Sequence, residues 1–267
     1  MLLFVSMNIK TNPKIIAHRG ASSSAPENTL SSIRKALSLE VDYIEIDVRL
    51  SNDGIPVVIH DESLVRTGRI ITNDHSSAAH APFEIANPLV HELTLNEIKS
   101  YDVGSWFHDS YVGEPVPTLQ EVLQENWLGT GLMIEIKECD QSPKVIVEAI
   151  FEVLNNMPAL PSNLLIGSFC LETITEVNKR LDPSKPIAQV IGIAESSDMI
   201  PQFLQNGASH IALCQSILTP DLVDRLNKQD VEVWTFTVDD HLFAKKLVSY
   251  GVSGIISNAP SKHKSPE

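Results

Sequence analysis

Short runs of strand-forming residues alternate with helical patterns along most of this 267-residue chain. Such alternation is typical of βα units that build a parallel sheet. The runs that we expect to form strands cover residues 14–18, 43–50, 56–60, 132–137, 164–168, 186–191, 210–214, 231–238 and 253–257. These nine runs are one more than a closed (β/α)8 barrel contains.

The surplus strand is identified by its short connection to the strand before it. Only "SNDGI", residues 51–55, separates the second and third runs. This segment is too short for a crossover helix, and Asp-Gly favours a hairpin turn. If Asp53 and Gly54 form a two-residue turn, counting back along both strands places Asp47 opposite His60. Opposed residues have Cβ atoms about 5 Å apart, so this count puts a histidine beside a carboxylate.

Eight parallel strands remain once the return strand of the hairpin is set aside. The chain length is close to the roughly 250 residues typical of a (β/α)8 barrel. We therefore expect an α/β fold, a TIM barrel, in a single domain that covers residues 1–267. A small insertion after its second strand, at about residues 48–110, would begin with the β-hairpin.

Capping residues mark the starts of several helices. In "PENTLSSIRKAL", residues 26–37, Asn28 or Thr29 can cap a helix whose apolar residues recur at helical spacing. Residues 94–99 and 118–123 each begin with threonine followed three residues later by glutamate, which is the capping-box pattern. These signals place helices between the predicted strands.

Charge and cysteine content argue against several classes of protein. The 34 acidic and 20 basic residues give a net charge of −14, whereas nucleic-acid binding depends on clustered Lys and Arg. Cys139, Cys170 and Cys214 lack the spacing of a zinc site or a disulfide framework. The first ten residues lack the pattern of a signal peptide, and no run is long enough to cross a membrane. We expect a cytoplasmic protein without stable membrane anchoring, and the sequence does not indicate its oligomeric state.

Acidic residues alternate with apolar ones on two of the predicted strands. In the run at 43–50, side chains of period two put Glu45 and Asp47 on the face opposite the isoleucines. In the run at 132–137 the same period puts Glu135 on that face. Because barrel helices cover the apolar face, these three carboxylates should point into the barrel.

Buried carboxylates are costly unless they are paired or bound to metal. One interpretation is that they form salt bridges with Lys137, Arg19 or Arg49. The interpretation that we favour is a hard divalent cation held by all three acids. An all-oxygen ligand set suits Mg²⁺ or Ca²⁺ better than Zn²⁺, with Mn²⁺ a further candidate.

Two histidines stand at strand ends that converge on the acids. His18 ends the first run and His60 ends the hairpin return, at the carboxyl end of the barrel where such enzymes place their sites. Two imidazoles, one acting as base and the other as acid, are what displacement at phosphorus requires. Arg19 and Lys137 would supply positive charge for phosphate oxygens.

Several motifs, in order, resemble the glycerophosphodiester phosphodiesterase family. These are "AHRG" followed by "PENT", then "EID", "DGIPVVIHD" and "MIEIK". Further matches are "HDESLVRT", "DVGSWF", "VPTLQEVL" and "SF" at Ser168 and Phe169, so the similarity extends from about residue 14 to 260. The resemblance implies a metal-dependent (β/α)8 barrel that hydrolyses small glycerophosphodiesters to glycerol 3-phosphate and an alcohol.

The resemblance also implies roles for individual residues. His18 and His60 would be the general acid and base, and Arg19 and Lys137 would bind phosphate. The three acids on the second and fourth runs would hold the metal. Glu27 and Asn28 of "PENT" would orient the site, although capping of the following helix explains Asn28 equally well.

The chain departs from the family pattern near its end. It reads "FTVD" at 236–239 where relatives commonly read "WTVN", and Ser257 and Asn258 where they commonly read "TD". Phe236 would keep an aromatic wall against the substrate without an indole NH. Trp234, two residues earlier on the same strand face, and Phe236 would either pack in the core or line the substrate site. The departures bear on substrate preference and leave the type of reaction unchanged.

Other functions remain as alternatives. A lysophospholipase D-like enzyme would use a similar set of residues on a lipid, and would need an apolar patch near the site, for which residues 81–90 are the candidate. A catalytically silent phosphodiester-binding protein would lack a histidine or an acid, and none is missing. Metal-dependent amidohydrolase barrels carry HxH on the first strand, which "AHRG" does not supply.

Overall fold

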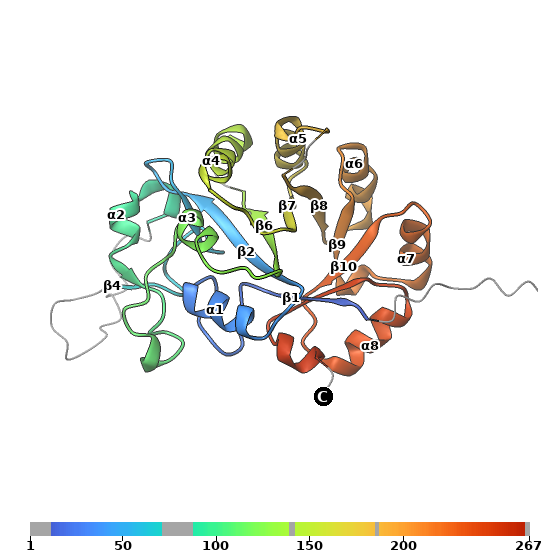
Figure 1. The fold of residues 1–267 in the computed structure, drawn as a ribbon, viewed down its shortest axis with the longest axis horizontal. Helices are drawn as coiled ribbons and strands as arrows, with labels where there is room; N and C mark the ends of the chain where they lie inside the picture. Colours follow the sequence, from blue (N-terminus) through green and yellow to red (C-terminus); the bar gives the residue numbers. More distant parts are fainter. Residues whose placement is uncertain (1–11, 71–87, 139–141, 185–186, 265–267) are drawn as a thin grey trace, which may run out of the picture.

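Eight strands pair in parallel and close on themselves in the computed structural model, which describes residues 12–70, 88–138, 142–184 and 187–264 (Figure 1). The strands are β1 (Lys14–Ala17), β2 (Tyr43–Leu50), β6 (Gly131–Ile136), β7 (Leu164–Ser168), β8 (Gln189–Ala194), β9 (His210–Cys214), β10 (Glu232–Phe236) and β11 (Gly254–Ser257). β1 pairs with both β2 and β11 and thereby closes the barrel. The predicted (β/α)8 barrel is confirmed, although β8 begins three residues later than the run expected at 186–191.

Helices follow the strands and cover the outside of the barrel (Figure 1). They are α1 (Leu30–Ser38), α3 (Leu119–Leu123), α4 (Pro143–Asn156), α5 (Leu171–Arg180), α6 (Ile200–Gln205), α7 (Pro220–Asn227) and α8 (His241–Ser249), with a 3-10 helix, η5 (Pro260–His263), after β11. The largest core lies between strands and helices, and Ile44, Ile46 and Val48 of β2 belong to it. The period-two prediction for this strand is therefore confirmed. None of the helices in the described ranges combines the length and apolar character needed to cross a bilayer.

A second group of apolar side chains fills the inside of the barrel. It includes Ile16, Tyr43, Met133, Leu165 and Trp234. Trp234 is fully buried, and its ring lies 5.0 Å from the Tyr43 ring in an edge-to-face arrangement. Trp234 is thus a core residue, which decides between the two interpretations of that side chain.

The hairpin after β2 is confirmed, but its turn is one residue longer than predicted. β2 pairs antiparallel with β3 (Pro56–Val58). The Ser51 N–H donates to the Ile55 carbonyl at 3.0 Å, which leaves three residues in the turn. Gly54 takes φ +79°, the left-handed conformation that such a three-residue turn requires.

The longer turn shifts the register by one residue. The expected opposition of Asp47 and His60 is therefore wrong, because the Ile59 N–H donates to the Asp47 carbonyl at 3.0 Å. β3 ends at Val58, so His60 lies beyond the ladder. The direction of its side chain is set by the following loop and its hydrogen bonds, and strand register does not decide it.

The segment between β3 and α3 builds a small lobe beside the barrel, at the left of Figure 1. It contains β4 (Arg69–Ile70), η1 (Val90–Glu92), α2 (Leu95–Ile98), β5 (Tyr101–Asp102) and η2 (Asp109–Tyr111). Its own core is formed by Val57, Ile59, Leu64, Val90, Ile98, Val103 and Val116. Thr94 and Thr118 cap α2 and α3 with the expected capping boxes. The loop directly after β3, which contains His60, belongs to this lobe and lies at the carboxyl end of the barrel.

Candidate active site

Three carboxylates converge at the carboxyl end of two neighbouring barrel strands. Glu45 and Asp47 project from β2, and Asp47 is in register with Glu135 of β6. Each of these residues offers a carboxylate oxygen within 4.8 Å of the others, and all three are buried. The cluster predicted from alternation thus forms in the structure.

Two cationic side chains partly neutralise the cluster. Lys137 Nζ lies 2.9 Å from Asp47 Oδ1 and also contacts the Glu135 carboxylate. Arg19 Nε lies 3.2 Å from Asp47 Oδ2. The salt bridges of the first interpretation therefore exist, but they centre on Asp47. Within the described chain, Glu45 Oε1 is buried without a hydrogen-bond partner.

The electrostatics differ strongly between the three acids. Burial and the neighbouring Asp47 carboxylate raise the pKa of Glu45 well above its usual range. The same two causes raise the pKa of Glu135 to about 7. Burial works in the same direction at Asp47, yet Lys137 and Arg19 hold the pKa of that carboxyl well below its usual range. A buried all-oxygen set, in which one oxygen lacks a hydrogen-bond partner in the described part of the chain, fits a hard divalent cation.

His18 stands at the edge of this cluster. Its Nε2 lies 4.0 Å from Glu45 Oε2, and its Nδ1 lies 2.7 Å from Asn258 Oδ1. Burial lowers the pKa of His18 to about 4, and the nearby Arg19 cation acts in the same direction. This environment favours the uncharged ring at neutral pH.

A left-handed turn after His18 brings Arg19 to the acids. Arg19 and Gly20 have φ +57° and +77°, and the Arg19 N–H donates to Glu45 Oε2 at 2.8 Å. A Cβ at Gly20 would lie 2.7 Å from the backbone carbonyl carbon of Ser32 in α1. The glycine of "HRG" is therefore required both by its backbone angle and by the close approach of the helix.

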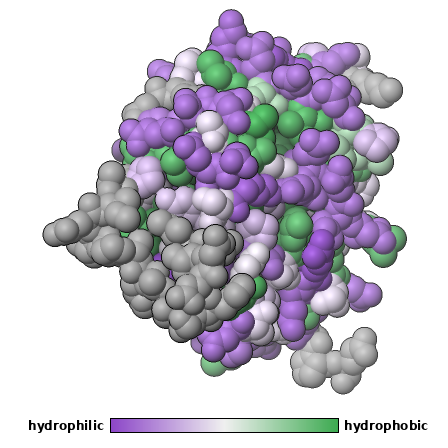
Figure 2. Space-filling model, turned by 90° about the vertical axis from the view of Figure 1, so that its left-hand side faces the viewer, coloured by the Kyte–Doolittle hydropathy of each residue, from purple (hydrophilic) through white to green (hydrophobic). Residues whose placement is uncertain are grey.

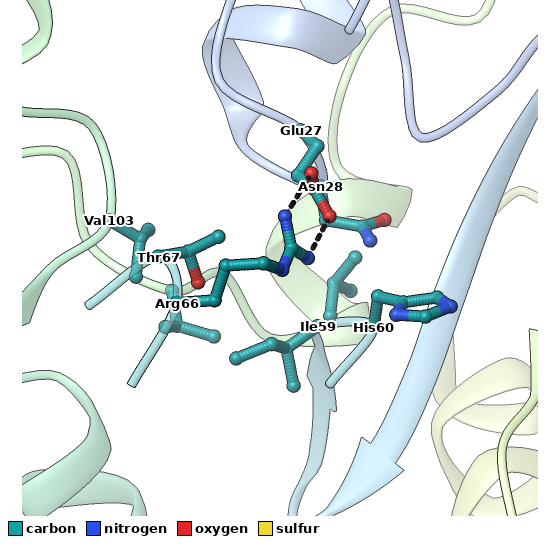
Figure 3. Close-up of a pocket in the computed structure, with 9 residues that line it drawn as sticks. Glu27, Asn28, Ile59, His60, Arg66, Thr67 and Val103 are labelled. Carbon is teal, nitrogen blue, oxygen red and sulfur yellow. Dashed lines mark hydrogen bonds and ion pairs between the residues drawn. The ribbon is translucent and has the colours of Figure 1, made fainter. Parts of the chain in front are cut away.

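His60 is held by a chain of charges from the small lobe. Its Nδ1 lies 2.7 Å from Asp61 Oδ1, and Arg66 Nε donates to Asp61 Oδ2 at 2.5 Å. The Arg66 guanidinium also makes two hydrogen bonds to the Glu27 carboxylate, drawn as dashed lines in Figure 3. Burial lowers the pKa of His60. Glu27 in turn pairs with Arg19 at 2.8 Å, so one network connects the two sides of the site.

Arg66 and Asp61 were not predicted as site residues. They belong to the "HDESLVRT" motif, which was the signal that could have identified them. Asn28 orients Asp47 through its side chain, while Thr29 is the residue that caps α1. Of the two roles considered for Asn28, the structure shows the contact with Asp47 and not the cap, and Glu27 contacts Arg19 and Arg66.

An aromatic pair borders the site beside the cations. Phe236 and Phe169 lie edge to face with ring centroids 5.8 Å apart, and Lys137 Nζ is 5.9 Å from the Phe169 centroid. Both phenylalanines are partly exposed, unlike Trp234 below them. Phe236 is thus placed where it can contact a ligand.

Two of the departures near the chain end, Asp239 and Asn258, contact each other. Asn258 Nδ2 donates to Asp239 Oδ2 at 2.9 Å, and the Asn258 backbone N–H donates to Asp239 Oδ1 at 2.8 Å. Each is the residue that the family pattern places at the other position. These two departures therefore amount to an exchange of an amide and a carboxylate within one contact.

The described surface around the small lobe is mainly polar. Figure 2 faces this side of the molecule and shows hydrophilic side chains over most of the coloured surface, interrupting the hydrophobic ones. Residues 81–87 of the candidate apolar segment at 81–90 lie outside the described residues.

Comparisons with known proteins agree with these features. The family model described as "Glycerophosphoryl diester phosphodiesterase family" matches residues 18–262. A putative glycerophosphodiester phosphodiesterase of Bacillus subtilis is 31% identical over 250 residues, covering 92% of this chain and 94% of that protein. A glycerophosphodiester phosphodiesterase of Caldanaerobacter subterraneus is 31% identical over 252 residues, with coverage of 92% and 94%.

A solved structure is similar over nearly the same length. It is an Oleispira antarctica phosphodiesterase in complex with the product sn-glycerol-3-phosphate, with a TM-score of 0.82 and 29% identity. The similarity covers 94% of this chain and 95% of that one. The family resemblance expected from the motifs is confirmed.

Proposed function

This chain belongs to the glycerophosphoryl diester phosphodiesterase family, and from that premise we propose that it hydrolyses glycerophosphodiesters to glycerol 3-phosphate and an alcohol. The observation that carries the proposal is the pairing of two histidines with one acid cluster. His18 Nε2 lies 4.0 Å from Glu45 Oε2. His60 is linked to the same cluster by the contacts that run through Asp61, Arg66, Glu27 and Arg19 to Asp47. Substrates of this class are small, water-soluble diesters such as glycerophosphocholine or glycerophosphoethanolamine.

Glu45, Asp47 and Glu135 would hold one divalent cation, Mg²⁺ or Ca²⁺, with Mn²⁺ as a further candidate. Two observations support this assignment: Glu45 Oε1 has no hydrogen-bond partner among the residues that the structure describes, and all the donors are oxygens. When bound, the cation supplies the positive charge that lets an anionic diester approach three carboxylates. Arg19 and Lys137 offset only part of that negative charge, because both already pair with Asp47.

Arg19 and Lys137 would bind the phosphate oxygens. Both cations are largely buried and lie against the acid cluster, so their charges are little screened by water. Burial opposes the charged form, but the Asp47 carboxylate raises the pKa of Lys137 above its usual value, which keeps the ammonium protonated. Both side chains would stabilise the charge that develops on phosphorus oxygens as the new bond forms.

One histidine of the pair would remove a proton from the nucleophile, and the other would protonate the leaving alkoxide. In this step a new P–O bond forms and the P–O bond to the alcohol breaks. One ring gains the proton of the nucleophile, and the other ring gives a proton to the leaving alkoxide. The nucleophile is either water or the neighbouring hydroxyl of the substrate's own glycerol, and the second route passes through a cyclic phosphate. Phe236 and Phe169 would form an apolar wall against the substrate, which their partial exposure supports.

The test is release of glycerol 3-phosphate from a panel of glycerophosphodiesters and one lysophospholipid. The protein is treated with EDTA, and Mg²⁺, Ca²⁺ or Mn²⁺ is then added back. We expect activity on the water-soluble diesters that returns with a cation. Activity confined to the lysophospholipid would move the substrate class to lipids. The absence of turnover with every cation would indicate a protein that only binds phosphodiesters.

Variants test the roles of the histidines. Folded His18→Ala and His60→Ala proteins should each lose about 100-fold or more in kcat. Near wild-type turnover in either variant would contradict its part in the acid–base pair.

A further inference from the structure

His18 is the first member of a chain of three polar side chains that leads away from the acid cluster. His18 Nδ1 lies 2.7 Å from Asn258 Oδ1, and Asn258 Nδ2 lies 2.9 Å from Asp239 Oδ2. His18 and Asn258 are separated by 240 positions in the sequence. β1 and β11 bring them together, because the His18 N–H donates to the carbonyl of Ser257 at 2.9 Å.

The chemistry of Asp239 determines the orientation of the amide. Both oxygens of an ionised carboxylate can only accept hydrogen bonds. Asp239 Oδ1 accepts from the Ser257 hydroxyl and from the Asn258 backbone N–H, while Oδ2 accepts from the Asn258 side chain. Burial opposes ionisation, but these donors hold the pKa of Asp239 below its usual value. The NH₂ group of Asn258 must therefore face Asp239.

The orientation of the amide in turn determines which nitrogen of His18 carries hydrogen. With its NH₂ group turned to Asp239, Asn258 presents only its oxygen to His18. An oxygen accepts, so His18 Nδ1 must donate. Nδ1 keeps its hydrogen whether or not the ring is charged, and Nε2 is then the nitrogen that exchanges a proton with a ligand.

We propose that Asp239 and Asn258 are positioning residues that hold the Nδ1–H tautomer of His18 and direct Nε2 to the reacting groups. The proposal deepens the proposed function and rests on it where turnover is concerned. The tautomer itself is independent of turnover. The tautomer of His60 is held more directly, because its Nδ1 contacts the Asp61 carboxylate without an intervening amide.

Replacement of Asp239 by asparagine should reverse the donor and acceptor roles of Asn258 and His18. In Asp239→Asn the side-chain oxygen must stay at the Oδ1 position, since the Asn258 backbone N–H there can only donate. The new NH₂ group then faces the NH₂ group of Asn258, which must turn over. Asn258 would then donate to His18 Nδ1, and the hydrogen of His18 would move to Nε2.

The paired exchange Asp239→Asn with Asn258→Asp should restore the original arrangement. The new carboxylate at 258 would accept from the amide at 239 and from His18 Nδ1–H. Asp221→Asn is the matched control, because it removes one exposed carboxylate at the start of α7.

The experiment measures the ¹⁵N resonances of His18 by NMR, together with kcat and KM, in protein supplied with Mg²⁺ or Ca²⁺. We expect protonated Nδ1 in the wild type, the paired variant and the control, and protonated Nε2 in Asp239→Asn. In Asp239→Asn kcat should fall roughly 100- to 10,000-fold with little change in KM, as for a histidine in the wrong tautomer. The paired variant should recover to within about tenfold of wild type.

Two results would overturn the proposal. One is an unchanged His18 tautomer in Asp239→Asn, and the other is a kcat for that variant within about twofold of wild type. If the wild-type protein turns over none of the diesters, the proposed function fails while the ¹⁵N spectra still decide the tautomer.

Discussion

Asn28 makes two hydrogen bonds to Asp47, one to its carboxylate and one to its backbone. Asn28 Nδ2 donates to Asp47 Oδ2 at 2.7 Å, and Asn28 Oδ1 accepts from the Asp47 N–H at 3.1 Å. Asn28 itself takes φ +57°, a conformation that asparagine tolerates better than most residues. The loop before α1 thus fixes the direction of a carboxylate that we assign to the metal.

Replacement of Asn28 by alanine should weaken cation binding. Partners that orient a metal ligand typically contribute 10- to 100-fold in affinity, so we expect a loss of about that size. Calorimetric titration with Mg²⁺ or Ca²⁺ measures it. Asn28→Gly is the control, because it relieves the backbone angle and also lacks the amide. Wild-type affinity in Asn28→Gly would show that the amide is not what orients Asp47.

Cation binding should stabilise the wild-type protein. A cation at 100 times its Kd adds about 2.7 kcal/mol to the free energy of unfolding. Glu45→Gln should lose this increment, yet be no less stable than wild type without the cation, because it removes a buried carboxylate with a raised pKa. Thermal unfolding with EDTA and with added cation measures both, with the exposed Glu172→Gln as control. An equal shift in Tm for Glu45→Gln and wild type would contradict the assignment.

Arg66→Gln should lower kcat without unfolding the protein. The change releases both Asp61 and Glu27, and so frees the His60 ring from its support. We expect a loss of roughly 10- to 100-fold, as for other residues that orient a site. Arg34→Gln is the matched control, because Arg34 makes a two-pronged contact with Glu125 on the outside of the barrel. Equal kcat values for the two variants would contradict the role of Arg66 in supporting His60.

The small lobe should lose stability in acid. Asp102 is buried, and its carboxylate accepts from the N–H groups of Gly104, Ser105 and Gly113. Burial opposes ionisation, but these three donors lower the pKa of Asp102. The ionised Asp102 carboxylate therefore stabilises the fold fully above its unfolded-state pKa of about 3.9. This contribution is lost as the pH falls through the lower pKa of Asp102 in the folded state.

Urea unfolding of wild type and Asp102→Asn at several pH values tests this sign. At pH 7 the variant should be less stable by roughly 1–3 kcal/mol. The difference should shrink below about pH 4, where the unfolded chain of the wild type takes up the proton. A difference that is constant with pH would mean that ionisation of Asp102 has no part in it.

Phe236→Ala should raise KM more than it lowers kcat. The side chain borders the site, and loss of its contact with substrate should cost roughly tenfold in KM. Trp234→Phe is the comparison, since Trp234 lies two residues below on the same strand and is fully buried. That change should lower the free energy of unfolding by roughly 1–3 kcal/mol and leave KM unchanged. A KM effect in Trp234→Phe and only a stability effect in Phe236→Ala would contradict the roles assigned to the two aromatic residues.

The acids could be predicted because their positions follow from local geometry. In β2 the side chains alternate strictly, so Ile44 and Ile46 on the helix side place Glu45 and Asp47 inside the barrel. The hairpin was predictable for the same reason, from its short connection. Its register was not, since the Ser51–Ile55 hydrogen bond adds one residue to the turn and moves Asp47 opposite Ile59.

The sequence by itself determined the barrel and the strand residues that face its interior, because periodicity and connection length act over a few neighbouring residues. The tertiary structure decided the partners of those residues. Arg66 reaches Glu27 across 39 positions, and Asn258 reaches His18 across 240. Such contacts depend on which loops the closed barrel brings to one end, and on hydrogen bonds between side chains that no local spacing encodes.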